Sequence, residues 1–321
     1  MNAEICYSIV IPVYNEEAVI DQTYRRLKKV MESTKESYEL VFVNDGSCDH
    51  TTAIIKDFSD QDDAVKLITF SRNFGHQIAI TAGMDYASGA AVVVIDADLQ
   101  DPPELILEMI AKWKEGFDVV YAKRTKRKGE TFFKKQTAHL FYRILKASTD
   151  LEIPTDTGDF RLLDRRVCEE LKRLPEKNRY VRGLVSWVGF RQTAVEYERD
   201  ERPAGETKYP LKKMIKLSLD GLTSFSYKPI KIATYTGGIL IFWGLISLAG
   251  MLLLKLSTAF VIAGWNLVIA MQLVLTGILL TMMGLIGEYI GRIYDEVRNR
   301  PLYIVSECYG LKKKERKVKV C

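Results

Sequence analysis

The stretch AVVVIDADLQDPPE, residues 91–104, decides the fold of this chain. It opens with an apolar, β-branched run, and such a run bounded by polar residues predicts a strand buried on both faces. Side chains two positions apart in an extended chain point the same way, so Asp96 and Asp98 face one side and Gln100 continues that register. Asp101, followed by two prolines, predicts a helix start with the aspartate as its N-terminal cap.

The acids that follow this strand are candidate metal ligands. Ligands in open parallel sheets bind beyond the carboxyl ends of the strands. The oxygens of Asp96, Asp98 and Gln100 suit a hard divalent cation, Mg²⁺ or Mn²⁺, which takes few protein oxygens and leaves positions for substrate phosphates. The alternative is a capped turn with solvated acids, because a DxD pattern by itself is common. The position at the end of a buried strand favours the metal site.

Three further strand predictions precede this stretch, at Tyr7–Val13, Tyr38–Val43 and Val65–Phe70. Helices are expected between them, from 18 to about 33, up to about 58, and from about 76 to 87. This alternation indicates an α/β domain with a mostly parallel sheet and helices on both faces. A further strand is expected at Phe117–Ala122.

Polar side chains follow each predicted strand and should meet at one edge of the sheet, where Tyr14, Asp45 and Arg72 would join Asp96 and Asp98. An aromatic ring there could stack on a base, and a carboxylate could accept a hydrogen bond from a base N–H. A basic stretch after the strand at 117–122 begins with Lys123 and Arg124. It offers phosphate contacts, although a charge run is more often a solvated face.

Two apolar runs in the second half predict a membrane hairpin. Residues 232–254 carry no charged side chain and can span a bilayer, and a second run covers 265–286. Basic residues flank both outer ends, so the positive-inside rule places the α/β domain and both termini in the cytoplasm, with two spans in the membrane. Residues 212–225 fit an amphipathic helix in the membrane interface. A buried soluble hairpin is the alternative.

The domain plan follows from these segments. We expect a catalytic domain at 1–202, an acceptor loop with a juxtamembrane amphipathic helix at 203–230, two transmembrane helices at 231–290 and a basic tail at 291–321. The five cysteines are scattered, which favours a reducing compartment. No GxGxxG or P-loop is present, so dinucleotide binding and ATPase activity lose support. The basic residues of the tail adjoin the membrane spans, so no nucleic-acid partner is expected.

The motifs together resemble those of inverting family 2 glycosyltransferases of the polyprenyl-phosphate type. The chain is most similar to bacterial bactoprenol glucosyltransferases and more distantly similar to dolichyl-phosphate mannose synthases. The resemblance covers nearly the whole chain in order and implies the GT-A fold. It rests on IPVYNEE at 11–17, VNDGS at 43–47, SRNFGHQIA at 71–79, DADLQDPPE at 96–104, AKR at 122–124, GDFRL at 158–162, RPAGETKY at 202–209 and GEYIGRIYDEVRNRP at 287–301.

The resemblance implies a role for each matching residue. A nucleotide pocket would be lined by Pro12, Tyr14, Glu16 and Asp45, with Asp45 on the base and Arg72 nearby. Asp96, Asp98 and Gln100 would surround the metal, with Asp98 the most direct ligand, and Asp159 would be the catalytic base. Phosphates of the donor or of a polyprenyl phosphate acceptor would be bound by Arg124, Lys134 or the adjacent Lys135, Arg202 and Lys208.

The ionisation of the acceptor phosphate argues against a role for Asp159 as a catalytic base. A phosphate monoester has its second pKa near about 6, so the nucleophile is largely deprotonated at neutral pH, and Asp159 could instead orient the sugar or the acceptor. The expected reaction is inverting transfer of a hexose from a UDP-sugar, glucose first, to undecaprenyl phosphate at the cytoplasmic face of the bilayer. The alternatives are UDP-GlcNAc or another sugar nucleotide as donor, and a non-catalytic, membrane-tethered sugar-nucleotide-binding subunit. A homo-oligomer formed through the hairpin is compatible with the sequence.

Overall fold

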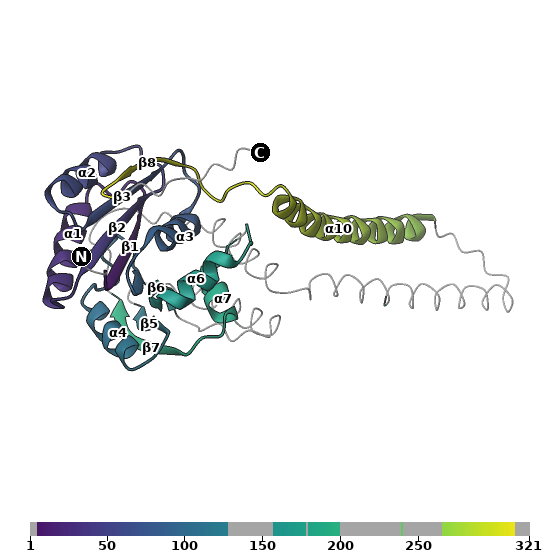
Figure 1. The fold of residues 1–321 in the computed structure, drawn as a ribbon. Coiled ribbons are helices and arrows are strands. Elements are labelled where there is room, and N and C mark those ends of the chain that lie inside the picture. Colours follow the sequence, from purple (N-terminus) through teal and green to yellow (C-terminus); the bar gives the residue numbers. More distant parts are fainter. Residues whose placement is uncertain (1–4, 128–156, 178, 200–238, 240–264, 312–321) are drawn as a thin grey trace, which may run out of the picture. The chain divides into compact units, whose positions relative to one another are not determined.

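The computed structural model describes residues 5–127, 157–177, 179–199, 239 and 265–311. The chain divides into two compact units, one comprising Met1–Leu217 and Pro301–Cys321 and the other Ser218–Arg300. The first unit holds an α/β domain, and the described part of the second holds one long helix (Figure 1). The two units are treated separately below.

The α/β domain contains an eight-stranded mixed sheet in the order β7-β5-β6-β4-β1-β2-β3-β8. The central strands β4, β1, β2 and β3 are parallel, as are β5 and β7, whereas β6 and β8 run antiparallel to their neighbours. The strands are β1 (Tyr7–Val13), β2 (Tyr38–Asn44), β3 (Val65–Phe70), β4 (Ala91–Val94), β5 (Val119–Arg127), β6 (Thr157–Asp164), β7 (Gln192–Arg199) and β8 (Val305–Tyr309). The expected α/β, GT-A-like architecture with a mostly parallel sheet is therefore present.

Helices cover both faces of the sheet, as the alternating sequence pattern predicts. Figure 1 shows α1, α2 and α4 on one face and α3, α6 and α7 on the other. Their bounds are α1 (Ile20–Ser33), α2 (Thr51–Gln61), α3 (His76–Tyr86), α4 (Leu105–Lys114), α6 (Arg165–Arg173) and α7 (Val181–Trp187). The main core lies on the α1, α2 and α4 face, where alternate β1 side chains such as Ile9 and Ile11 pack with Leu27 and Met109.

The prediction that Asp101 caps the next helix is wrong. Helix α4 begins at Leu105, and Glu104 at its N-cap makes no capping hydrogen bond through its side chain. Asp101 is instead 1% exposed and accepts a hydrogen bond from the Tyr197 hydroxyl on β7. A buried carboxylate needs a strong partner, so this tertiary contact outweighs the local capping preference.

The second predicted span lies within α10, a 33-residue helix from Trp265 to Val297. An ion pair joins Glu288 and Arg292 one turn apart at 3.1 Å, as their spacing predicts. Large apolar side chains stay exposed along this helix, among them Val268, Met271, Leu279, Met283, Ile286, Ile290 and Ile293. In the part of the chain that the structure describes, no helix meets the length and hydropathy needed to cross a bilayer. The first predicted span, 232–254, apart from Ile239, and the amphipathic helix lie outside the described residues, so the hairpin stays a prediction.

Helix α3 approaches β1 so closely that only glycine fits at position 83. A Cβ built there would lie 2.0 Å from Cγ1 of Val10. We expect Gly83→Ala to lower the free energy of unfolding by about 1–3 kcal/mol, because the well-packed interior cannot absorb the extra methyl group. Urea denaturation of the purified protein measures the change.

A double-variant cycle provides the control for this prediction. Val10→Ala removes the methyl groups that the new side chain would meet, so Gly83→Ala should cost less in that background than in the wild type. Equal costs in both backgrounds would show that the close approach of α3 to β1 is not the cause.

Candidate active site at the carboxyl edge of the sheet

The loops that follow β1 and β2 are bonded to one another at the edge of the sheet. The parallel register pairs Val13 with Asn44, so both strands end at the same level. Asn15, which has a positive φ of 53°, accepts from the Cys48 N–H at 2.8 Å and donates its own N–H to Ser47 at 3.0 Å. Tyr14 stands beside them and is 37% exposed. The predicted nucleotide residues Tyr14, Glu16 and Asp45 therefore come from two loops that the fold brings together, and Pro12 lies near the end of β1 beside them.

Asp45 binds the loop that follows β3. Its carboxylate is 4% exposed and accepts from the N–H groups of Phe74, at 2.7 Å, and Gly75, at 3.0 Å. Burial raises the pKa of Asp45, and the two backbone hydrogen bonds oppose that shift. The loop also rests on Gly46, because a Cβ there would lie 2.7 Å from the backbone carbon of Arg72. The side chain of Arg72 stacks on Phe74, with its guanidinium carbon 4.1 Å from the ring centre.

Asp159 lies next to Asp96 because β6 runs antiparallel to β4. The register pairs Arg161 with Val94, so positions 159 and 96 meet just beyond the end of β4. His76, the first residue of α3, lies between them, with Nε2 3.4 Å from a carboxylate oxygen of each. Three elements that are remote in sequence thus converge on one small region.

Cationic and polar groups surround the Asp159 carboxylate. Arg182 on α7 donates to both of its oxygens, at 2.8 and 3.1 Å, and the Gln77 amide donates at 3.2 Å. Burial opposes ionisation of Asp159, but the charge of Arg182 and hydrogen bonds from His76 and Arg182 outweigh it and hold the pKa well below its usual range. The carboxylate is therefore a permanently charged acceptor with a fixed orientation, which is a poor starting point for a general base.

Gln77 joins the two helices that flank Asp159. Its side-chain oxygen accepts from the Val181 N–H at 3.1 Å, at the start of α7, while its amide nitrogen contacts Asp159. The orientation of Arg182 relative to α3 therefore depends on the same amide that touches the carboxylate.

His76 and Asp96 shift each other's titration. Burial lowers the pKa of His76, but the negative charges of Asp96 and Asp159 outweigh it and raise the pKa to about 9. Burial raises the pKa of Asp96 to about 6, and the nearby carboxylates of Asp159, Asp101 and Asp98 add to the rise, whereas His76 opposes it. The positive charge of His76 therefore does not compensate for burial and for the neighbouring carboxylates, and the pKa of Asp96 stays above its usual value.

The predicted metal ligands suit a divalent cation that substrate oxygens help to hold. Asp96 Oδ1 is buried and makes no hydrogen bond to any described residue, and Asp98 is also buried, with one oxygen accepting from the Gln100 N–H at 3.2 Å. Within the described residues, no group of three or more His, Cys, Asp or Glu side chains is arranged to hold a metal ion by itself. Two carboxylates and an amide need further ligands, which the phosphates of a nucleotide can supply.

Arg124 is held in place by Asp101 and Tyr197. Its Nε donates to the Tyr197 hydroxyl at 3.0 Å, its guanidinium lies 3.6 Å from Asp101, and Tyr197 also donates to Asp101. Burial by itself would lower the pKa of the Arg124 guanidinium. The negative charge of Asp101 raises that pKa by more, so it lies above its usual value. Gly158 leaves room for this guanidinium, because a Cβ there would lie 2.5 Å from its Nη2 atom.

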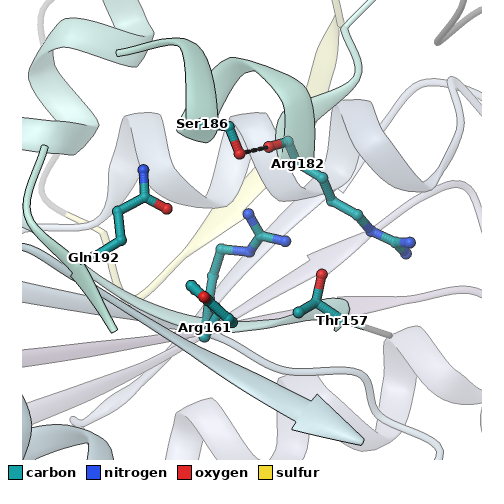
Figure 2. Close-up of a pocket in the computed structure, with 6 residues that line it drawn as sticks. Thr157, Arg161, Arg182, Ser186 and Gln192 are labelled. Carbon is teal, nitrogen blue, oxygen red and sulfur yellow. Dashed lines mark hydrogen bonds between the residues drawn. The ribbon is translucent and has the colours of Figure 1, made fainter. Parts of the chain in front are cut away.

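A small pocket lies between β5, β6, β7 and α7, lined by Tyr121, Thr157, Arg161, Arg182, Ser186 and Gln192 (Figure 2). Arg161 is 4% exposed and donates to the Gly158 carbonyl at 2.8 Å. The Ser186 hydroxyl donates to the Arg182 carbonyl at 3.2 Å. Arg182 therefore both lines this pocket and pairs with Asp159.

Sequence reasoning missed several residues of this site. His76 and Gln77 belong to the SRNFGHQIA motif but received no role, and Arg182 and Tyr197 lie outside every motif. The sequence does carry a signal for His76 and Gln77, because they begin a helix at the carboxyl edge of the sheet. No local signal marks Arg182 or Tyr197. The predicted phosphate ligands Lys134, Lys135, Arg202 and Lys208 lie outside the described residues.

Comparison with known proteins agrees with the sequence motifs. The pattern of Glycosyl transferase family 2 matches residues 8–172. The chain is 67% identical, over 98% of its length and 97% of the other protein, to the uncharacterized glycosyltransferase YkcC of Bacillus subtilis (strain 168). It is 41% identical, over 94% of its length and 98% of the other protein, to the SfII prophage-derived bactoprenol glucosyl transferase of Shigella flexneri.

Solved structures resemble the chain only distantly. Glucosyl-3-phosphoglycerate synthase from Mycobacterium tuberculosis, solved with Mn²⁺, uridine diphosphate and glucosyl-3-phosphoglycerate, covers 68% of this chain and 77% of its own, with 18% identity and a TM-score of 0.46. This similarity is too low to bear on the chemistry of the chain.

The raised pKa of His76 predicts a pH-dependent stability. The folded chain keeps a proton that the unfolded chain, with a pKa of 6.5, releases, so the added stability is complete below about pH 6.5 and is lost as the pH rises towards 9. We expect the free energy of unfolding in chelator to fall by about 2 kcal/mol more across this range in the wild type than in His76→Gln. This value discounts the shift for the 29% exposure of the imidazole.

Urea denaturation at several pH values measures this difference. His50→Gln makes the same substitution at an exposed histidine and should behave as the wild type does. Parallel pH profiles for His76→Gln and the wild type would show that the two carboxylates do not retain a proton on His76.

Proposed function

The chain belongs to Glycosyl transferase family 2, and from this premise we propose that it transfers a hexose, glucose first, from a UDP-sugar to undecaprenyl phosphate with inversion. The observation that carries the proposal is the 41% identity to bactoprenol glucosyl transferases, which extends over 94% of the chain and therefore beyond the α/β domain. Family membership makes the chain a glycosyltransferase. The donor and acceptor remain the proposed part.

The donor would bind at the carboxyl edge of the sheet. Tyr14 is exposed there and offers a ring on which a base can stack. Asp45 is buried beside it, and its carboxylate oxygens have lone pairs left to accept from the N–H of uracil after bonding to Phe74 and Gly75. The exposed ring of Tyr14 and the carboxylate of Asp45 both support binding of a uridine nucleotide at this edge.

Asp96, Asp98 and Gln100 would hold Mg²⁺ or Mn²⁺ together with the diphosphate of the donor. Such a cation would neutralise the charge that develops on the departing diphosphate. The buried Oδ1 atom of Asp96 makes no hydrogen bond to described residues and has only the 3.4 Å ion pair with His76, and the pKa of Asp96 is raised to about 6; both support a cation at this position.

The proposed reaction is a direct displacement. An oxygen of the lipid phosphate forms a bond to the anomeric carbon as the bond from that carbon to UDP breaks, so the configuration inverts. At neutral pH the attacking phosphate is already largely ionised, since its second pKa is about 6. Asp159, charged and held by Arg182, would therefore position the sugar or His76 rather than remove a proton.

The acceptor side of the proposal rests on basic and apolar surfaces. Arg124 is a fixed cation beside Gly158 and is suited to a phosphate group. The exposed apolar side chains of α10 support contact with a lipid bilayer. We propose that the chain is a bacterial membrane protein anchored by two spans. The α/β domain and both termini would lie in the cytoplasm. Copies of the chain would associate through the hairpin.

Release of the nucleoside diphosphate, UDP or GDP according to the donor, tests the reaction class and the donor. In detergent with Mg²⁺ or Mn²⁺, we expect turnover only when undecaprenyl phosphate is present and with one member of a panel of UDP-glucose, UDP-GlcNAc, UDP-galactose and GDP-mannose. Asp98→Asn should lower the rate roughly a hundredfold, the size expected when one group that stabilises transition-state charge is lost. Asp63→Asn, the same change at an exposed acid, is the control.

Other outcomes of this assay have defined meanings. Turnover with UDP-GlcNAc would keep the reaction and change the sugar. Absence of turnover with every donor, from protein that still binds UDP, would contradict catalysis of this reaction and favour a sugar-nucleotide-binding subunit.

The role of Asp159 can be read from a pH profile. We expect Asp159→Asn to lower kcat by about a hundredfold and by the same factor from pH 6 to pH 9, because the carboxylate positions groups and stays ionised throughout. Arg182→Lys keeps the charge but loses the two-point contact, so its loss should be intermediate. Recovery of the Asp159→Asn activity above the pKa of the lipid phosphate would instead identify Asp159 as a base.

A further inference from the structure

Residues 301–309, which follow α10, return to the sheet and pack beside the 71–75 loop, whose backbone binds Asp45. Strand β8 pairs antiparallel with β3, and the Ser71 N–H donates to the Ile304 carbonyl at 3.0 Å (Figure 1). Residues 301–309 are reached only after the chain has passed through the second apolar run. The segment therefore joins the membrane-proximal half of the sequence to the end of β3.

Tyr303 contacts both elements that flank the loop at 71–75. Its ring stacks on Phe70, the last residue of β3, with the ring centres 5.2 Å apart and an interplanar angle of 18°. Its hydroxyl donates to Asp85 on α3 at 2.9 Å. The loop leaves β3 at Phe70 and enters α3 at His76, so Tyr303 contacts the start of the loop directly and, through Asp85, the last turn of the helix that follows it.

Aromatic contacts continue from Tyr303 to the predicted nucleotide site. Phe70 is 2% exposed and meets Phe74 edge to face, with the ring centres 5.6 Å apart. The Phe74 N–H donates to Asp45 at 2.7 Å. Tyr303, Phe70, Phe74 and Asp45 thus form a continuous series of contacts.

We propose that Tyr303 is a positioning residue for nucleotide binding: through Phe70 and α3 it keeps the 71–75 loop seated on Asp45 and Gly46. The proposal rests on the proposed function, because it assumes that UDP binds at Asp45. Without the contact, the folded protein would spend part of its time with the loop unseated, and its apparent affinity for UDP would fall by that fraction.

A purely structural role for β8 is the competing explanation. An added strand covers the otherwise open edge of β3, which protects the sheet from pairing with other chains. In that case the loss of Tyr303 would lower stability but leave the UDP affinity of the folded protein unchanged. The two explanations therefore differ in binding rather than in stability.

The test uses the full chain in detergent with Mg²⁺ and measures the Kd of UDP by calorimetry, together with KM for the UDP-sugar and for undecaprenyl phosphate. Tyr303→Leu should raise the Kd and the UDP-sugar KM by about three- to tenfold, the range that the loss of one aromatic pair supports. The KM for undecaprenyl phosphate should not change. Tyr303→Phe keeps the ring and loses only the bond to Asp85, so its effect should be about twofold.

Two controls separate positioning from destabilisation. Val30→Ala removes buried side-chain volume on α1, and Glu307→Gln breaks the exposed ion pair between β8 and Lys56. Both should keep the wild-type Kd, although Val30→Ala lowers the melting temperature.

Each remaining outcome decides the proposal. An unchanged Kd in Tyr303→Leu, an equal rise in Val30→Ala, or an equal rise in both KM values would overturn it. If Tyr303→Leu does not fold, Tyr303→Phe decides, and a Kd equal to that of the wild type would overturn the proposal. Absence of UDP binding in the wild type would instead refute the proposed function on which this inference rests.

Discussion

Ion pairing around the Asp159 carboxylate connects three parts of the chain that are far apart in sequence. Arg182 comes from α7, His76 from α3, and Asp96 from the end of β4. A carboxylate that is 7% exposed would be costly without such partners. Burial and the neighbouring carboxylates raise the pKa of Asp96 although His76 opposes the rise, and the only described partner of its buried Oδ1 atom is the ion pair with His76 at 3.4 Å. We propose that the cation and the donor bind beside these incompletely neutralised carboxylates.

The topology of the sheet explains why these groups meet. Parallel strands β1, β2 and β4 bring their carboxyl ends to one edge, and β6 alone among the neighbours of β4 arrives from the opposite direction. Its first residues therefore reach the same edge from the other side, and Asp159 faces Asp96. Arg124 on β5 reaches the site over Gly158, held by Asp101 and Tyr197. In the proposed site, loops of parallel strands would supply the donor side, and antiparallel β6 would supply the groups beside it.

Much of this arrangement is predictable from the sequence, and the remainder depends on tertiary contacts. The strand rhythm and the acids after each strand predict the sheet and its polar edge, because both follow from local periodicity. The interpretation of Asp101 as a helix cap fails because Tyr197, 96 residues away, provides a stronger partner. Arg182 and Tyr303 carry no local signal, since their importance lies in contacts with Asp159 and Phe70 that exist only after folding.

The central claim is that the acid cluster at the carboxyl edge is completed by a divalent cation together with a uridine nucleotide. The most direct measurement is the Kd of UDP by calorimetry, with Mg²⁺ and after its removal by a chelator, in the full chain. The account predicts that UDP binds at least about tenfold more weakly without the cation, because carboxylates whose charge no cation neutralises repel a diphosphate. The affinity should be restored when Mg²⁺ is returned. An equal Kd in both conditions would contradict the account.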